Sequence, residues 1–373
     1  MAQPLELGLF MMPLHPPHRP FGEVLREDAE KIILADRLGF AEAWCGEHYT
    51  ATTEPITSPL IFLATLIAQT RQIKFATGVI NLPNHHPAIV AGEAAMFDHL
   101  ANGRFIFGIG SGALASDFEL FGTADGRERE ARMLESIDMI TKIWASDPPY
   151  DLAGKFWNVK VVENIVPELG VGQMAKPLQQ PHPPIALSIM SPFSGTMVTA
   201  AKRGWLPVSA NFIPEYSVAS HYKKYLEGCE AAGRQPDPSQ WRVARNIVVA
   251  ETDAQARDIV FNPKGSLHYY FSYLWKALTI GNYTIAMKLD AKMPDAEMNA
   301  EKALEHIVIY GSPKTVAEKL AAFRDRVGPF GHLVLACPDW EGHNHAEQSE
   351  SMQLLANEVM PMLRGSVALK RAS

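Results

Sequence analysis

Short apolar runs alternate with amphipathic helical segments along most of the chain. Each run is long enough for one strand and is apolar almost throughout, which is typical of parallel strands covered on both faces. The runs are Leu5–Met11, Phe40–Cys45, Ile73–Ile80, Arg104–Ile109, Ile185–Ile189, Leu206–Ala210, Arg242–Ala250 and Gly331–Cys337. This alternation predicts a series of strand–helix units.

The segments between the runs carry helical spacing and helix-end signals. Val24, Ala29 and Ile32 share one helical face, and Gly39 ends that helix as glycine commonly does. Ser312–Pro313 supplies a cap residue followed by proline at the first helical position. Further helices are expected at Ser58–Thr70, Ile89–Ala101, Asp117–Ala145, Thr196–Arg203, Tyr216–Ala232 and Gln348–Leu363.

Eight strand–helix units predict an α/β protein with the (β/α)8 TIM-barrel fold. A doubly wound open sheet is the alternative, but no G-x-G-x-x-G motif follows the first strand. Two stretches interrupt the alternation, and we interpret them as insertions after strands four and seven of a single domain spanning residues 1–373. The proline-rich stretch 147–184 is expected to be a loop or hairpin. The aromatic-rich, irregular stretch 262–299 is either a lid over an apolar substrate or a segment packed against the barrel or a partner subunit.

Composition narrows the class of protein. The chain has 373 residues, is 47% hydrophobic, and carries 34 Lys and Arg against 41 Asp and Glu. A net charge of −7 argues against nucleic-acid binding, which normally needs a basic face. The 3 cysteines are widely spaced and form no C-x-x-C pair, which favours a reducing compartment.

The segment Leu60–Ala68 is the longest apolar stretch and is too short to span a bilayer. The N-terminal residues also lack a basic region followed by a long apolar run. We therefore expect a cytoplasmic protein that uses no membrane anchor.

Polar and small residues follow the predicted strands, at the barrel face where active sites form. His48 follows strand two; it is either a general base or a loop histidine bonded to Glu47 or to backbone. Ser194–Gly195–Thr196 precedes a helix and is either a phosphate site or an ordinary helix cap. The other residues at these strand ends are Tyr49, Asn81, His85, His86, Gly110, Ser111, Gly112 and Ser191.

Histidine pairs raise the question of a metal. His15 and His18 flank two prolines, and His343-Asn344-His345 is an H-x-H motif. Barrel hydrolases place such a pair after strand one, whereas this motif follows strand eight. We therefore expect no catalytic metal, and a metal-dependent hydrolase is the weakest alternative.

Several motifs occur together in a recognisable order. They are GFAEAWCGEHY at Gly39–Tyr49, IKFATGVINLPNHHP at Ile73–Pro87, DHLANGRFIFGIGSGALASDFELFG at Asp98–Gly122 and GSPKTVAEKL at Gly311–Leu320. With these motifs the chain resembles the bacterial luciferase-like, flavin-dependent monooxygenases, most closely the limonene monooxygenase type. The resemblance covers nearly the whole chain.

The resemblance implies a barrel that binds reduced FMN at the C-terminal ends of its strands, with His48 as the active-site histidine. Luciferases carry a second histidine where this chain has Tyr49, and an arginine for the FMN phosphate where this chain has Ser111. The family's strained, often cis, peptide would fall at Gly78-Val79. The cofactor-binding residues that follow are Gly78, Val79, Asn81, Ser111, Ser194, Gly195 and Thr196.

The resemblance further implies a two-component reaction. A separate flavin reductase would use NAD(P)H to supply FMNH2, and a flavin C4a-(hydro)peroxide would transfer one oxygen atom from O2 to a small apolar substrate, terpene- or ketone-like. Epoxidation, hydroxylation and Baeyer–Villiger oxidation all stay open. The alternatives are an F420-dependent hydride-transfer oxidoreductase of the same superfamily and a non-catalytic flavin-binding accessory subunit. Family members are commonly homodimers or homotetramers.

Overall fold

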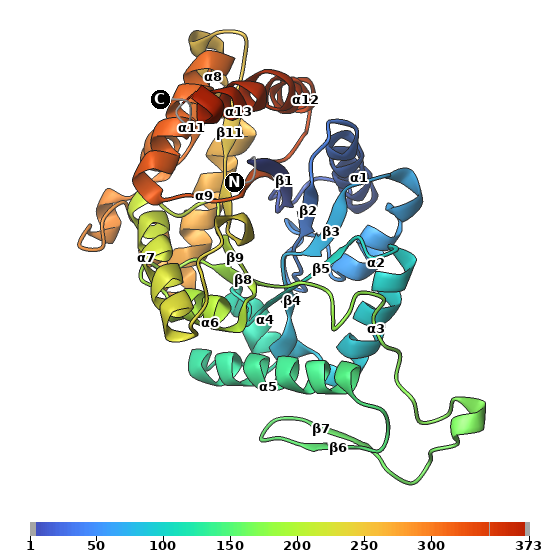
Figure 1. The fold of residues 1–373 in the computed structure, drawn as a ribbon. Coiled ribbons are helices and arrows are strands. Elements are labelled where there is room, and N and C mark those ends of the chain that lie inside the picture. Colours follow the sequence, from blue (N-terminus) through green and yellow to red (C-terminus); the bar gives the residue numbers. More distant parts are fainter. Residues whose placement is uncertain (1–4, 343, 370–373) are drawn as a thin grey trace.

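The strands form a closed parallel barrel with helices around it (Figure 1). The computed structural model describes residues 5–342 and 344–369. The barrel strands are β1 (Glu6–Met11), β2 (Glu42–Cys45), β3 (Lys74–Thr77), β4 (Ile80–Asn81), β5 (Phe105–Gly110), β8 (Ile185–Ile189), β9 (Leu206–Ser209), β10 (Arg242–Arg245) and β13 (His332–Cys337). Their order is β3-β2-β1-β13-β10-β9-β8-β5, and pairing of β3 with β5 closes the ring. The predicted TIM barrel is confirmed.

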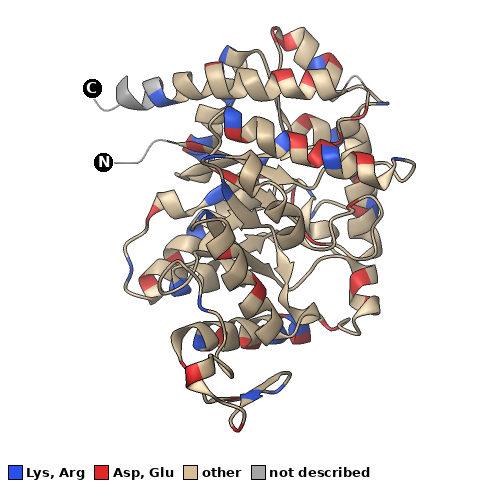
Figure 2. Ribbon diagram, turned by 90° about the vertical axis from the view of Figure 1, so that its right-hand side faces the viewer, with Lys and Arg blue, Asp and Glu red and all other residues tan. Residues whose placement is uncertain are grey.

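The helices cover the outside of the barrel. They are α1 (Phe21–Arg37), α2 (Pro59–Ala64), α3 (Pro87–Leu100), α4 (Ala115–Leu120), α5 (Gly126–Ala145), α6 (Gly195–Arg203), α7 (Glu215–Ala231), α8 (Asp253–Val260), α9 (Ser266–Ile280), α10 (Ala300–His306), α11 (Pro313–Val327), α12 (Asn344–Leu354) and α13 (Met360–Leu369). A π-helical turn, Leu355–Val359, joins the last two. Basic and acidic residues are interspersed along these helices (Figure 2).

The barrel interior contains a layer of inward-facing side chains, several of them small. The layer consists of Trp44, Ala76, Ile106, Ala186, Val208, Ala244 and Val334, with Phe10 packed against it. Alternation along each strand puts these residues inside and sends their neighbours toward the helices. The alanines leave space above the layer, and Phe10, Val208 and Ala244 form part of the lining of a cavity there.

Four predicted elements prove to be broken. The predicted helix Ser58–Thr70 is α2 followed by a separate 3-10 turn, Ile67–Gln69. Strand three stops at Thr77 and resumes as β4 after a cis Gly78-Val79 peptide. The predicted helix Asp117–Ala145 is two helices, because Asp125 caps α5 by accepting from the backbone N–H groups of residues 127 and 128. Strand seven divides into β10 and β11 (Ile247–Val249), and β11 pairs with an unpredicted strand, β12 (Ile309–Gly311), in a separate parallel pair. The polar residues Arg245 and Asn246 stand where the two strands separate, a break that the strand prediction overlooked.

The two insertions differ in kind. Residues 147–184 hold an antiparallel hairpin, β6 (Tyr150–Ala153) and β7 (Asn158–Val161), so the expected loop or hairpin is confirmed. The prediction that 262–299 is irregular is wrong, because helix α9 occupies much of it. Its buried residues Leu267, Tyr270, Phe271 and Leu274 follow helical spacing that the aromatic density obscured.

Among the described residues, no helix combines the length and the apolar character that crossing a membrane would require.

The close contact that closes the ring should make the stability of the protein sensitive to any side chain at Gly108. Thr77 Oγ1 donates to the Gly108 carbonyl over 2.7 Å, and a Cβ on Gly108 would lie 1.7 Å from the Thr77 carbonyl oxygen. Gly108→Ala should therefore lower the free energy of unfolding by about 1–3 kcal/mol or more. Gly92→Ala in α3 is the control, because its Cβ meets nothing within 4 Å and should stabilise by about 1 kcal/mol. Urea denaturation measures the free energy of unfolding of both variants. A Gly108→Ala variant as stable as Gly92→Ala would contradict the close packing.

Candidate active site

A large cavity opens at the C-terminal ends of the barrel strands. It has a volume of about 1190 Å³, including solvent at its opening. Most of the side chains around it are apolar, among them Met12, Val79, Leu114, Met190 and Phe212. A group of polar side chains lies at the ends of β2 and β4, where His48, Glu47, Glu54 and Asn81 contribute to the lining. The sequence-predicted residues His48, Gly78, Val79, Asn81 and Ser111 all line this cavity.

Helix α9 covers one side of the cavity. Tyr273, Leu274, Ala277 and Leu278 contribute to its lining. The Tyr273 hydroxyl accepts a hydrogen bond from Thr53 Oγ1 over 3.0 Å, which connects the helix to the loop after β2. Of the two interpretations of the aromatic stretch, this arrangement favours the lid.

A second cavity continues from the first. Its volume is about 1120 Å³, and both cavities share a set of lining residues. The shared residues are Gly110, Ser111, Gly112, Ala113, Ser188, Met190, Leu278, Gly281 and Tyr283. Ser194 and Thr196 line the second cavity, whereas Gly195, the exposed first residue of α6, lines neither. The site therefore has an apolar part and a hydroxyl-rich part.

Close contact between β3–β4 and β5 shapes the boundary between these parts. The cis peptide Gly78-Val79, at the position that the family resemblance implied, turns the chain toward β5. A Cβ on Gly110 would lie 2.5 Å from a Val79 methyl carbon, and one on Gly112 would lie 2.9 Å from Phe118. Gly112 also has a φ of +86°, a conformation that favours glycine. These glycines let the backbone of β5 itself form the cavity wall.

Two carboxylates hold the imidazole of His48. Its Nδ1 lies 3.1 Å from Asp117 Oδ2, and its Nε2 lies 3.0 Å from Glu54 Oε2. Its side chain is 12% exposed. The Glu47 carboxylate contacts His85 instead, at 2.7 Å, so the expected alternative of a His48–Glu47 bond is not what the structure shows.

Burial alone would lower the pKa of His48, but the charges of Glu54 and Asp117 outweigh it and raise that pKa above its usual value. Asp117 is also buried, yet its contact with His48 and hydrogen bonds from Thr50 and Tyr49 lower its pKa. An ionised Asp117 can only accept, so Nδ1–H of His48 donates to it. Burial raises the pKa of Glu54.

A second histidine lies beside this group. Asn81 donates from its backbone N–H to Glu47 Oε2 and from Nδ2 to the Glu47 carbonyl. Glu47 in turn holds His85, and its charge outweighs burial to raise the pKa of His85. The Tyr49 hydroxyl lies 3.4 Å from His85 Nε2. The geometry at the end of β4 is thus fixed by a buried carboxylate, while His86 caps α3 by accepting from the backbone N–H of residue 88.

The second cavity contains a cation that the sequence did not predict. Arg129 of α5 contributes to its lining together with Ser111, Ser194 and Thr196. The Arg129 guanidinium lies 3.4 Å from the centre of the Phe118 ring, and its Nη1 donates to two backbone carbonyls. Its buried Nε has no hydrogen-bond partner among the described residues. Ser194 caps α6, so its helix-capping interpretation is confirmed.

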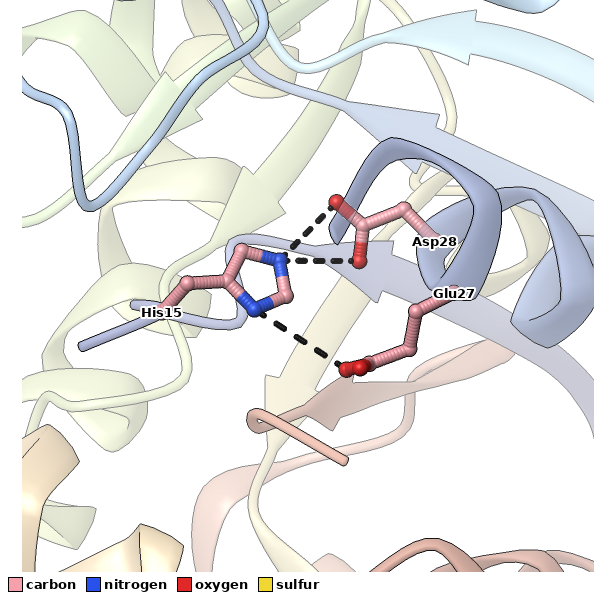
Figure 3. Close-up of side chains that lie close together, drawn as sticks. All are labelled: His15, Glu27 and Asp28. Atoms are coloured by element: carbon pink, nitrogen blue, oxygen red, sulfur yellow. Dashed lines mark hydrogen bonds and ion pairs between the residues drawn. The ribbon is translucent and has the colours of Figure 1, made fainter. Parts of the chain in front are cut away.

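The candidate metal ligand His15 belongs to a buried ionic cluster (Figure 3). Its Nε2 lies 3.1 Å from Asp28, and its Nδ1 lies 3.9 Å from Glu27. Lys31 contacts both carboxylates at 3.1 and 3.2 Å, and Arg19 contacts Glu27 at 2.7 Å. Protein cations thus already neutralise the carboxylates, and the arrangement is that of an ion-pair network.

The other histidines considered as metal ligands lie apart from this cluster. His18 is exposed and pairs with Glu341 at 3.2 Å. His345 is also exposed and lies 3.9 Å from Glu30. His343, the first residue of the H-x-H motif, is outside the described residues.

A family model described as luciferase-like monooxygenase matches residues 5–328. The chain belongs to this family. It is 30% identical to 4-hydroxyprotoasukamycin monooxygenase of Streptomyces nodosus subsp. asukaensis, over 97% of this chain and 93% of that protein. It is 28% identical to limonene 1,2-monooxygenase of Rhodococcus erythropolis, over 97% of this chain and 88% of that protein. The resemblance found in the sequence is confirmed, and the protein is a monooxygenase of the luciferase-like, flavin-dependent kind.

A solved structure agrees with this assignment. The oxygenating constituent of 3,6-diketocamphane monooxygenase from Pseudomonas putida, a type II Baeyer–Villiger monooxygenase in complex with FMN, superposes with a TM-score of 0.86. It is 27% identical in sequence and covers 96% of this chain and 98% of its own. The barrel of this monooxygenase therefore matches that of an FMN-binding protein along almost its whole length.

Sequence reasoning missed three residues of the site: Glu54, Asp117 and Arg129. Each lies several residues away from a strand end, in a loop or helix that folds back over the barrel. Asp117 lies within the motif Asp98–Gly122 and Glu54 follows the motif Gly39–Tyr49 closely; this proximity to the family motifs was the available signal. Arg129 had no local signal, because only the fold of α5 brings it to the second cavity.

Asp117 should stabilise the loop that carries His48. Its carboxylate accepts from His48, from the backbone N–H groups of Tyr49 and Thr50, and from Thr50 Oγ1. Asp117→Asn should lower the free energy of unfolding by about 1.5–3 kcal/mol at pH 7. Because the pKa of Asp117 is lowered by folding, its contribution is present above its unfolded pKa and is lost as the pH falls through the folded value.

The difference between wild type and Asp117→Asn should therefore shrink as the pH falls below about 4. Glu119→Gln, an exposed change on the same helix, should have an effect within about 0.5 kcal/mol. Urea denaturation at neutral and acidic pH measures both. A constant difference across this range would contradict the assigned role.

Proposed function

We propose that this monooxygenase binds FMN, receives it reduced from a separate NAD(P)H-dependent flavin reductase, and inserts one oxygen atom of O2 into a small apolar substrate. The observation that carries the proposal is the continuous pair of cavities. One part is apolar and contains His48, and the other has hydroxyl groups and a cation. FMN is divided in the same way, because it has a flat aromatic ring system at one end and an anionic phosphate at the other.

The residues present fit FMN. Ser111, Ser194, Thr196 and Arg129 would hold the phosphate, with the hydroxyl groups as donors and the positive charge of Arg129 as the attraction. Arg129 would thus take the place of the arginine that luciferases carry at the position of Ser111. The backbone around Gly78, beside Val79 and Asn81, would face the ring system. Backbone N–H groups at the start of α6, including that of Gly195, would assist at the phosphate.

The relatives support the cofactor and the second component. The 3,6-diketocamphane enzyme binds FMN and is described as an oxygenating constituent, which is the wording for one component of a larger system. The reduced state of the flavin and its delivery by a reductase are proposed here for this chain on that basis.

When bound, reduced flavin supplies the electrons and the site of reaction with O2. The protein's own residues then have three tasks. The α9 residues Tyr273, Leu274 and Leu278 cover the cavity and exclude water. The apolar lining orients the substrate, and His48 holds a proton at Nδ1 for Asp117 and at Nε2 toward Glu54.

The lining indicates the chemistry of the substrate. Apolar side chains predominate, and the acidic residues Glu47 and Glu54 disfavour an anionic substrate. We propose a neutral, terpene- or ketone-like molecule. The geometry is compatible with both electrophilic and nucleophilic oxygen transfer.

We also propose that the chain forms a homo-oligomer. Ile89, Met96 and Leu100 of α3 are more than half exposed and lie on one helical face, and Ile61 of α2 is 73% exposed. Apolar helix faces of this kind favour association. The cytoplasmic location stays a prediction.

Arg129→Met separates phosphate binding from ring binding. It should weaken FMN binding about ten- to hundredfold, because a charge-assisted hydrogen bond is lost. Riboflavin, which lacks the phosphate, should bind wild type and variant equally within about threefold. Fluorescence quenching measures both affinities. The control is Arg132→Met, three residues further along α5, where Arg132 pairs with Glu128; it should change neither affinity. If Arg129→Met lost affinity for FMN and riboflavin equally, the phosphate would lie elsewhere.

His48→Ala tests the reaction. Wild type, given FMN, a flavin reductase, NAD(P)H and ¹⁸O2, should place one ¹⁸O atom in a product from a panel of terpenes and ketones. The variant should form that product at least about a hundredfold more slowly, because proton transfer at the site is lost. Mass spectrometry reads the product, and His18→Ala at the surface is the matched control. Product without ¹⁸O would refute the proposed function; undiminished rates in the variant would refute the role of His48.

A further inference from the structure

Glu54 is a buried carboxyl group in direct contact with the active-site histidine. It lies in the loop after β2, is 8% exposed, and contributes to the lining of the main cavity. Its Oε2 lies 3.0 Å from His48 Nε2. Within the described part of the chain, this ion pair is the only polar contact of the Glu54 carboxyl group.

The two carboxylates beside His48 are not equivalent. Asp117 accepts hydrogen bonds from Tyr49 and Thr50 as well as from His48, and these bonds keep it ionised. Glu54 lacks such bonds, and its burial favours the protonated form. Asp117 is therefore suited to orient the ring, whereas Glu54 is suited to exchange a proton with it.

Other titratable groups surround the pair and influence it. They come from the β1 loop, α1, the β2 loop, α4 and α9, and they are His15, Asp28, Glu47, Asp117, Tyr269, Tyr270 and Tyr273. The charge of His15 favours the ionised form of Glu54, while that of Asp117 opposes it. The tyrosines stay neutral, because burial raises their pKa values.

We propose that Glu54 is a proton-relay residue, which takes the proton from His48 Nε2 and delivers it to the oxygen atom that leaves as water. His48 Nε2 and Glu54 Oε2 form an ion pair at 3.0 Å, and both residues contribute to the lining of the main cavity, so a proton has only this short distance to cross. This inference rests on the proposed function, since that reaction needs such a proton.

The proton balance of this step closes. The O–O bond of O2 breaks, one oxygen atom forms a C–O bond with the substrate, and the other leaves as water. Both electrons come from the reduced flavin, which also brings two hydrogens that end in that water. The His48–Glu54 pair therefore lends one proton and recovers one in each turnover.

Glu54→Gln tests the relay. Glutamine keeps the size and an oxygen acceptor for Nε2–H but cannot carry the proton. We expect kcat for oxygenated product to fall about ten- to hundredfold, with FMN affinity and substrate KM unchanged within about threefold. The alkaline limb of the pH–rate profile should move to lower pH, because a negative charge that raises the pKa of His48 has been removed. Glu54→Asp should restore part of the rate.

A flavin-free measurement gives an independent readout. Nitrogen-15 NMR of labelled imidazoles should show His48 of wild type titrating in two steps, since it shares a proton with Glu54. In Glu54→Gln it should titrate in one step at lower pH. Glu341→Gln, which removes the exposed carboxyl beside His18, should leave His48 unchanged.

The outcomes separate the two proposals. If wild type forms no oxygenated product, the proposed function fails, and the NMR titration still decides whether Glu54 and His48 share a proton. If wild type is active and Glu54→Gln keeps its rate, its pH profile and a wild-type His48 titration, Glu54 only orients the ring and the relay is refuted. Should Glu54→Gln fail to fold, a single-step titration of His48 in wild type would refute the relay.

Discussion

The site depends on the close approach of the third and fifth strands of the chain. Thr77 can bond to Gly108, and Val79 can lie against Gly110, only because both partners lack a side chain. This contact closes the barrel while the cis Gly78-Val79 peptide separates β3 from β4. A larger residue at either glycine would push the strands apart. The same constraint that completes the ring thus places exposed backbone beside the cavity, where a planar ring system can approach.

Charge is distributed unevenly around the resulting site. Carboxylates gather at the end of β2, where Glu47, Glu54 and Asp117 hold two histidines. The second cavity is lined by hydroxyl groups and Arg129, together with the exposed Glu130. Between them the lining is apolar and is covered by α9. A site arranged in this way can attract a phosphate at one end, manage protons at the other and keep water away from the centre.

The sequence predicted the fold well, because apolar runs and helix caps are local signals. His48 was a candidate from its position after strand two, and only the family motifs favoured its active-site role. The Gly78-Val79 position was predicted through family motifs alone, since periodicity does not show which strand ends meet. Helix α9 was missed because its aromatic residues looked irregular while their buried members kept helical spacing. Glu54 and Arg129 could not be predicted from spacing, since their contacts arise from how a loop and a helix pack on the finished barrel.

The most direct test of this account is a crystal structure of the protein with FMN bound. The account predicts the phosphate against Arg129 and Thr196 and the ring system beside Gly78 and Val79, with its reactive edge toward His48. A flavin bound outside these two cavities, or bound with its phosphate at the His48 end, would contradict it.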